Sequence, residues 1–187
     1  DYEYKDAKFA TLRQAIYSLR ETKRLLTVNV YGLGAMTHPG DLALVLQKAV
    51  TETLRKHKIE IAVPTDYENY IEQIRQNPEI WNHLIDTHTA LSSVVADSDQ
   101  LAESLKTGDL GIFHRVSDTL REAQLDIRLN NDNIKQWLCE VQDRLTELGT
   151  YNGLLIVWDE FTDVMTDAIG VPVLKQLQEV AQKFMKE

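Results

Sequence analysis

The stretch Gly153-Leu-Leu-Ile-Val-Trp-Asp-Glu160 decides how the rest of this sequence is interpreted. Five consecutive apolar residues follow the glycine, and two adjacent carboxylates, Asp159 and Glu160, follow them. An unbroken apolar run of this length is typical of a strand buried on both faces, as in the centre of a parallel sheet. We therefore expect a strand that delivers two acidic side chains to the edge where ligands bind in α/β sheets.

A second strand is predicted upstream, at residues 25–31, where the hydrophobic period changes to two. Leu26, Val28 and Val30 share one face, and the opposite face is partly polar. A half-polar strand is typical of a position near a sheet edge. The short run Ile59-Glu-Ile-Ala-Val63 is either a third strand or an extended connection.

Helical periodicity dominates the remaining sequence. Thr65 and Glu68 have the spacing of a capping box, which predicts that a helix begins there, and Asn77-Pro78 predicts its end. Gly149 is placed to end the long helix that precedes the apolar strand. The helices are expected at about 6–24, 40–54, 66–76, 78–91, 98–106, 109–123, 134–148 and 172–184.

These elements predict a helix-rich α/β fold with a partial parallel sheet of two or three strands. We expect residues 1–187 to form a single partial domain of a larger protein, with a helical insert at 66–128. So few strands are fewer than a sheet of usual size contains. The sequence also lacks an initiator methionine, and its last helix has no stop signal, so we expect a segment of a longer chain.

Composition excludes several classes of protein. Hydrophobic residues make up 43% and charged residues 26% of the chain, as in ordinary globular domains. The net charge of −9 argues against a broad contact with nucleic acid phosphates, although it leaves such contact elsewhere in a longer protein open. No apolar run is long enough to cross a membrane. A single cysteine, Cys139, excludes an internal disulfide and fits a reducing, cytoplasmic compartment.

The apolar strand and its acidic end resemble the Walker B motif of P-loop NTPases, in the form with a glutamate after the aspartate. The resemblance implies that Asp159 binds a Mg²⁺ ion between itself and the β- and γ-phosphates of ATP. It also implies that Glu160 acts as the general base for the attacking water. A solvated strand end without any such role is the alternative interpretation of the same two residues.

The order of elements resembles large bacterial ATPases of the AAA+ and STAND-like group, and especially the P-loop proteins of phage-defence systems. In this comparison the helix at 6–24 is similar to the one that follows the phosphate loop. Residues 25–31 then resemble the second strand and residues 153–158 the third. The resemblance implies a cytoplasmic parent ATPase whose other segments contact this chain. It also implies that protein partners bind at the helical insert. An oligomer of the parent protein is compatible with the resemblance.

The sequence departs from this family at one essential point. It contains no Gly-x-x-x-x-Gly-Lys-Ser/Thr, so the backbone cradle and the lysine that bind phosphates are missing. We therefore expect this chain alone to neither bind ATP tightly nor hydrolyse it, whereas the parent protein would use ATP and Mg²⁺. A non-catalytic helical module for protein interaction is the competing interpretation.

Two other functions receive little support from the sequence. Gly32-Leu-Gly34 follows a strand, but Thr37 stands at the third glycine position of the dinucleotide fingerprint. The histidines at 38, 57, 83, 88 and 114 show no i, i+4 pair, and Cys139 has no partner at ligand spacing. A nicotinamide or flavin oxidoreductase and a zinc site are therefore both disfavoured.

Overall fold

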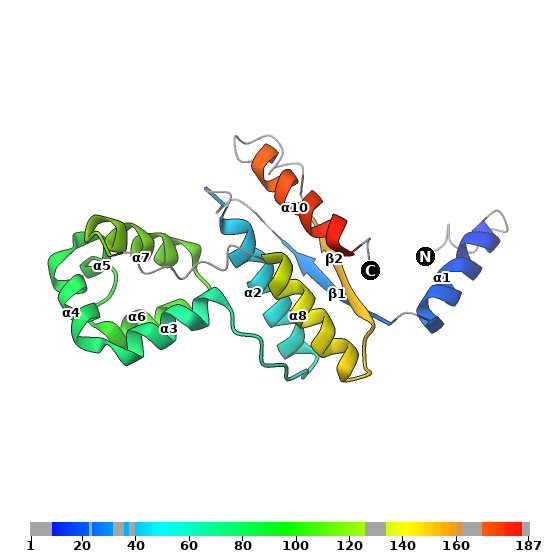
Figure 1. Cartoon of the computed structure of the whole chain (residues 1–187), viewed down its shortest axis with the longest axis horizontal. Coiled ribbons are helices and arrows are strands. Elements are labelled where there is room, and N and C mark those ends of the chain that lie inside the picture. Colours follow the sequence, from blue (N-terminus) through cyan, green and yellow to red (C-terminus); the bar gives the residue numbers. More distant parts are fainter. Residues whose placement is uncertain are drawn as a thin grey trace.

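The computed structural model describes residues 9–22, 24–31, 36–37, 40–125, 134–159, 161 and 170–184. Figure 1 shows three groups of elements. Two strands and the helices α2, α8 and α10 form the central body, the helices α3 to α7 form a group on one side, and α1 (Ala10–Thr22) stands apart on the other.

The two strands lie side by side and run parallel. β1 (Leu25–Val30) pairs with β2 (Gly153–Trp158), and the register runs from Leu25 opposite Gly153 to Val30 opposite Trp158. The predicted helix-rich α/β fold with a small parallel sheet is thereby confirmed. A parallel pair requires a long crossover connection, and here helices α2 to α8 lie within that connection.

Three helices cover one face of this sheet. They are α2 (Asp41–Lys56), α8 (Ile134–Glu147) and α10 (Gly170–Phe184). The alternate apolar residues of β1 are buried beneath them, as predicted from the period of two. The centre of this core consists of Leu26, Val28, Val30, Leu42, Leu46, Val50, Trp137, Leu138, Val141, Leu145 and Val173.

The other face of the sheet is open in the described part of the chain, and the prediction that the 153–158 strand is buried on both faces was wrong. Leu155 and Val157 are 45% and 44% exposed, and Leu25 beside them on β1 is 41% exposed. An apolar run indicates that both faces of a strand need to be covered, but it does not indicate which element covers each face. Here all three helices of the body pack on the same side.

Five helices follow the extended connection 59–65 and share a second core. They are α3 (Asp66–Gln76), α4 (Pro78–Thr87), α5 (Thr89–Ser92), α6 (Ser98–Lys106) and α7 (Leu110–Glu122). Trp81 lies at the centre of this second core and is 1% exposed. Its other buried members include Tyr67, Tyr70, Ile74, Leu84, Ile85, Leu91, Leu101, Leu105, Val116 and Leu120. These helices lie within the range 66–128, where an insert was expected, and are called the insert below; residues 126–128 lie outside the described residues.

The insert is joined to the body through α2. Leu44 of α2 belongs to the second core, and the side chains of Lys48 and Tyr67 both donate hydrogen bonds to the carbonyl of Gly108, at 3.1 and 3.3 Å. Burial, reinforced by the nearby carboxylate of Asp109, raises the pKa of Tyr67 well above its usual range, so its hydroxyl remains a donor. Gly108 has φ +64°, and a Cβ there would lie 2.9 Å from the Lys48 side chain.

The boundaries of the elements follow the sequence closely. The first helix, expected at 6–24, is described from Ala10 to Thr22, and the run at 59–63 forms an extended connection, not a strand. The helix expected at 78–91 is divided in two, because the backbone of His88 is extended and ends α4 before α5 begins.

The capping box at the start of α3 is present as predicted. The hydroxyl of Thr65 accepts a hydrogen bond from the Glu68 amide at 3.2 Å, and the Glu68 carboxylate accepts one from the Thr65 amide at 2.7 Å. Replacing Thr65 with alanine is therefore expected to lower the free energy of unfolding by about 1 kcal/mol in urea denaturation. Replacement with serine keeps the hydroxyl and serves as the control. An equal loss in both variants would contradict the capping role.

Candidate functional site

Asp159 lies at the carboxyl edge of the sheet. Its amide donates a hydrogen bond to the carbonyl of Val30 at 3.0 Å, which continues the pairing of the two strands one residue beyond β2. The side chain of Asp159 is exposed. Just before it, the Trp158 ring packs edge-to-face against Phe161, with ring centres 5.2 Å apart. Glu160, the predicted general base, lies outside the described residues.

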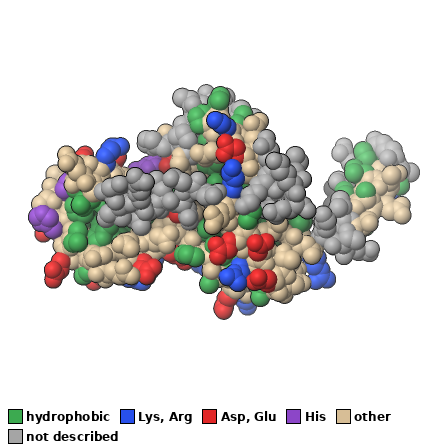
Figure 2. Space-filling model, viewed as in Figure 1, with side chains coloured by type: hydrophobic (Ala, Val, Ile, Leu, Met, Phe, Trp, Pro, Cys, Tyr) green, Lys and Arg blue, Asp and Glu red, His purple; other side chains and the backbone are tan. Residues whose placement is uncertain are grey.

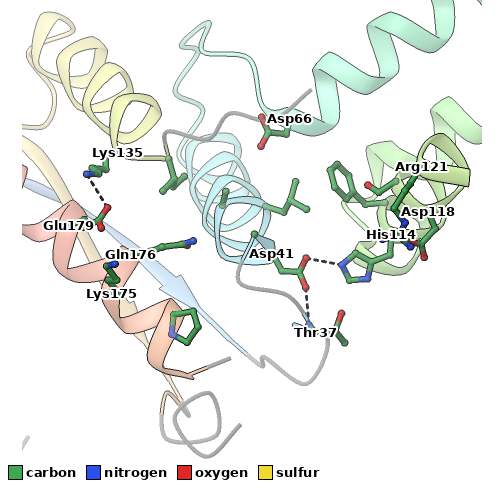
Figure 3. A pocket seen from close by; sticks show the side chains of 17 residues that line it. Thr37, Asp41, Asp66, His114, Asp118, Arg121, Lys135, Lys175, Gln176 and Glu179 are labelled. Carbon is green, nitrogen blue, oxygen red and sulfur yellow. Dashed lines mark hydrogen bonds and ion pairs between the residues drawn. The ribbon is translucent and has the colours of Figure 1, made fainter. Parts of the chain in front are cut away.

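A cavity of about 810 Å³, lined by both polar and apolar side chains, lies beside the body, on the carboxyl side of both strands. Figure 3 shows its wall, which combines the first turns of α2 and α8, residues 172–179 of α10, the start of α3 and one side of α7. The segment after β1 supplies Thr37 and Asp41, and the helix after β2 supplies Lys175 and Gln176. The position agrees with the general rule that α/β sheets bind ligands outside the carboxyl ends of their strands.

An aspartate–histidine pair connects the insert with the body at this cavity. One oxygen of the buried Asp41 carboxylate lies 2.7 Å from Nε2 of His114 on α7, and the other accepts the Thr37 amide at 2.8 Å. Figure 3 shows that Asp41 bridges these two groups. The same carboxylate lies in the first turn of α2, where the helix dipole favours a negative charge. Asp41 therefore links the segment after β1 to the helical insert.

The remaining charges of the cavity are largely paired with each other. Lys135 on α8 forms an ion pair with Glu179 on α10 at 3.3 Å, and Arg121 on α7 pairs with Asp118 at 2.6 Å. The wall thus carries both signs of charge and no cluster of cations. A strongly basic phosphate cradle is not formed by the described residues of this wall.

Of the two predicted site residues, only Asp159 is described, and Glu160 lies outside the described residues. Asp159 is not among the described residues that line the cavity, and Gly32, Gly34 and His38 lie outside the described residues. Cys139 is partly buried on α8. Among the described residues, no group of three or more histidine, cysteine, aspartate or glutamate side chains is arranged to bind a metal ion.

Sequence reasoning missed the Asp41–His114 pair. The two residues are 73 positions apart, and neither lies at a spacing that indicates a site. One local signal was available: an acidic residue directly after Pro39-Gly40 lies where a helix first turn is expected. That signal identifies Asp41 as a first-turn carboxylate but says nothing about its partner on α7.

Comparison with known proteins found no matching family model, no matching curated protein and no matching solved structure. Within the described part of the chain, none of the helices has the length and apolar character required for a membrane span.

Proposed function

We propose that this chain is the segment of a P-loop-type ATPase that carries the Walker B strand, with Asp159 as the Mg²⁺ anchor and Glu160 as the general base. The observation that supports the proposal best is the position of Asp159. It directly follows a strand of a parallel sheet, and its amide is bound to Val30 at the carboxyl end of the neighbouring strand. This is the place in a parallel α/β sheet where phosphate ligands are bound.

The residues present fit a Mg²⁺ ion bound together with a nucleotide. Mg²⁺ is usually held by only one or two carboxylates, with water and phosphate oxygens as its other ligands. One exposed carboxylate at the end of β2 meets that need, so a larger cluster of ligands is not required. When bound, the ion neutralises charge on the β- and γ-phosphates.

Each acidic residue then has a separate task. The hydrogen bond between the Asp159 amide and Val30 fixes the backbone of Asp159 and so limits where its carboxylate can be. Glu160 accepts a proton from the water that attacks the γ-phosphate, and orients that water beforehand. The sequence contains no phosphate-binding loop, so another part of the parent protein supplies the cradle for the phosphates.

The proposal also concerns the elements of the parent protein that would surround this segment. Each strand has one edge without a neighbour in the described part of the chain, and further strands of the parent sheet would pair there. A bacterial cytoplasmic ATPase fits the element order and the single cysteine of the chain. The insert α3 to α7, which has a core of its own, is then a surface for protein partners.

The Mg²⁺ dependence of hydrolysis tests the role of Asp159. In the parent protein, Asp159→Asn is expected to raise the Mg²⁺ concentration that gives half-maximal ATP hydrolysis by at least about tenfold, because one charge-bearing ligand is lost. The control is Asp143→Asn, which removes the same charge from the exposed side of α8. An unchanged Mg²⁺ dependence in Asp159→Asn would remove Asp159 from this role.

A non-catalytic interaction module is the second candidate function. The observation that favours it is the separate core of α3 to α7, because a group of helices with its own core can serve as an independent binding unit. The parent gene distinguishes the two functions. A Gly-x-x-x-x-Gly-Lys-Ser/Thr motif encoded within about 60 residues upstream of Asp1 favours the ATPase. Its absence from the whole gene favours the module.

A further inference from the structure

The connection between α2 and α3 contains a segment that resembles a strand. Its side chains alternate in burial: Ile59, Ile61 and Val63 pack on the core of the body, whereas Glu60 and Ala62 are exposed. This alternation, with three β-branched residues on the buried side, is typical of a strand. In Figure 1 the segment runs from the lower end of α2 toward α3, and neither of the two described strands pairs with it.

Both ends of this segment are fixed by hydrogen bonds. Lys58 has φ +56° and turns the chain at the end of α2, so that the amide of Ile59 donates to the carbonyl of Leu54 at 2.9 Å. At the other end, the indole N–H of Trp137 donates to the carbonyl of Pro64 at 3.0 Å. A segment held in this way loses little conformational entropy when it binds a partner.

The main chain between these two ends is not paired. None of the hydrogen bonds formed by the described residues uses the N–H or C=O groups of residues 60–63. In a strand, both groups of one residue point to the same side, and those of the next residue point to the other. Glu60 and Ala62 therefore share a side with Pro64, whose carbonyl faces Trp137. Such a row of donors and acceptors can pair with another strand.

A cavity of about 690 Å³ lies against this segment. Residues 58–63 form one wall, and the other walls include Leu54 of α2 and Trp137 and Val141 of α8. Apolar side chains therefore lie next to the unpaired main chain, within the range of volumes that is usual for ligand sites. A single extended chain can enter such a recess, whereas two copies of this chain cannot both enter the recess of the other. The shape thus favours a peptide segment over a second copy.

The charges of the cavity indicate what the peptide carries. Arg55 and Lys58 line the end where the segment begins, and both are exposed. Neither takes part in an ion pair between the described residues. The carboxylates of the lining belong to Glu60 and Glu68, and that of Glu68 is bound in the capping box. Figure 2 shows basic and acidic side chains together at the lower end of the body, where α2 ends. A carboxylate of the partner complements the two basic residues.

We propose that residues 59–63 bind an extended segment of a partner protein, which adds a strand along Glu60 and Ala62. The partner supplies main-chain hydrogen bonds, apolar side chains at alternate positions and an acidic residue beside Arg55 and Lys58. This surface is separate from Asp159 and is not formed by the helices of the insert. The tests need no nucleotide, so their result is independent of whether the parent protein hydrolyses ATP.

Selection from a library of random linear peptides displayed on phage is the first test. The immobilised chain is the target, and the strongest selected peptide is synthesised with a fluorophore and its affinity measured by fluorescence polarisation. We expect the selected peptides to alternate apolar with other residues and to contain an acidic residue near one end. Strand addition produces this pattern because every second side chain of the peptide points into the cavity.

Methylation of the peptide main chain is the second test, and it leaves the protein unchanged. Two versions of the selected peptide carry N-methyl groups at alternate amides, one version at odd and the other at even positions. Strand pairing uses only every second amide of the added chain. One version is therefore expected to bind at least about tenfold more weakly than the unmodified peptide, and the other to stay within about twofold.

Matched variants of the chain locate the site. Ala62→Pro removes one main-chain donor and is expected to weaken binding at least about tenfold, whereas Ala62→Ser keeps the donor and is expected to bind normally. Arg55→Glu is expected to weaken binding by a similar factor of about ten, because it repels the acidic residue of the peptide. Lys56→Glu is its control, since Lys56 lies in the same last turn of α2 but does not line the cavity. Circular dichroism and urea unfolding verify that each variant folds.

Several results would overturn the proposal. The selection could yield no peptide that binds the chain, or the two methylated versions could bind equally well. Equal affinities in Ala62→Pro and Ala62→Ser would exclude pairing at Ala62, and equal losses in Arg55→Glu and Lys56→Glu would exclude the acidic contact. A dimer of the chain that Ala62→Pro dissociates would make a second copy the occupant. A parent protein that does not bind the selected peptide would mean that its own chain covers the segment.

Discussion

If the chain carries the proposed Walker B strand, replacing Glu160 with glutamine is expected to slow ATP hydrolysis about 10²- to 10⁴-fold, the range that a positioned general base contributes. Glutamine keeps the size of the side chain but cannot accept a proton from the attacking water. Affinity for ATP should remain within about threefold, because the proposed role of Glu160 is to act on the attacking water and not on ATP itself. Single-turnover phosphate release and calorimetric binding of ATP measure the two quantities separately.

Asp163→Asn is the matched control for this prediction. It removes a carboxylate three residues further along the chain. It therefore tests whether the loss of any one negative charge in this segment slows the reaction. Turnover in that variant is expected to stay near the wild-type value. Unchanged hydrolysis in Glu160→Gln would exclude Glu160 as the base, and an equal loss of ATP affinity would instead assign it to binding.

The two acidic neighbours should therefore give different kinetic signatures. Loss of Asp159 changes how much Mg²⁺ the reaction needs, whereas loss of Glu160 lowers the rate at saturating Mg²⁺. Such a division is expected because a metal ligand and a general base act on different groups of the reaction. A simple solvated strand end would show neither signature in either variant.

The spacing of residues close in sequence was sufficient to predict the helix boundaries and the buried face of β1. The capping box of Thr65 and Glu68, the helix that begins at Pro78 and the buried alternate residues of β1 all follow from spacings of two to four residues. The parallel direction of the two strands was expected from the helices that separate them, because such connections produce parallel sheets.

Longer-range features could not be predicted from the sequence. Asp41 and His114 meet only because the insert packs on α2, and no local pattern specifies that packing. The exposure of Leu155 and Val157 depends on which side of the sheet the helices occupy, and the apolar run itself is the same for either arrangement. Hydrophobicity thus predicted that β2 needs cover, whereas the source of that cover is a matter of tertiary structure.

The second large effect is expected at Trp81, the residue at the centre of the insert core. Trp81→Ala should lower the free energy of unfolding by about 3–5 kcal/mol, because a buried indole is lost and the surrounding helices only partly fill the cavity. Ile80→Ala, at the neighbouring residue of the same helix, is the matched control. Ile80 is 52% exposed, so its replacement is expected to change stability by less than about 0.5 kcal/mol.

The position of the other tryptophans makes this variant a test of how the two cores are coupled. After Trp81 is removed, fluorescence comes only from Trp137 and Trp158, which both belong to the body, whereas circular dichroism reports all the helices. Since the insert alone loses its central side chain, we expect helix content to fall at lower urea concentration than the fluorescence changes. Coincident transitions would instead mean that Leu44 and the hydrogen bonds to Gly108 join the insert and the body into one cooperative unit.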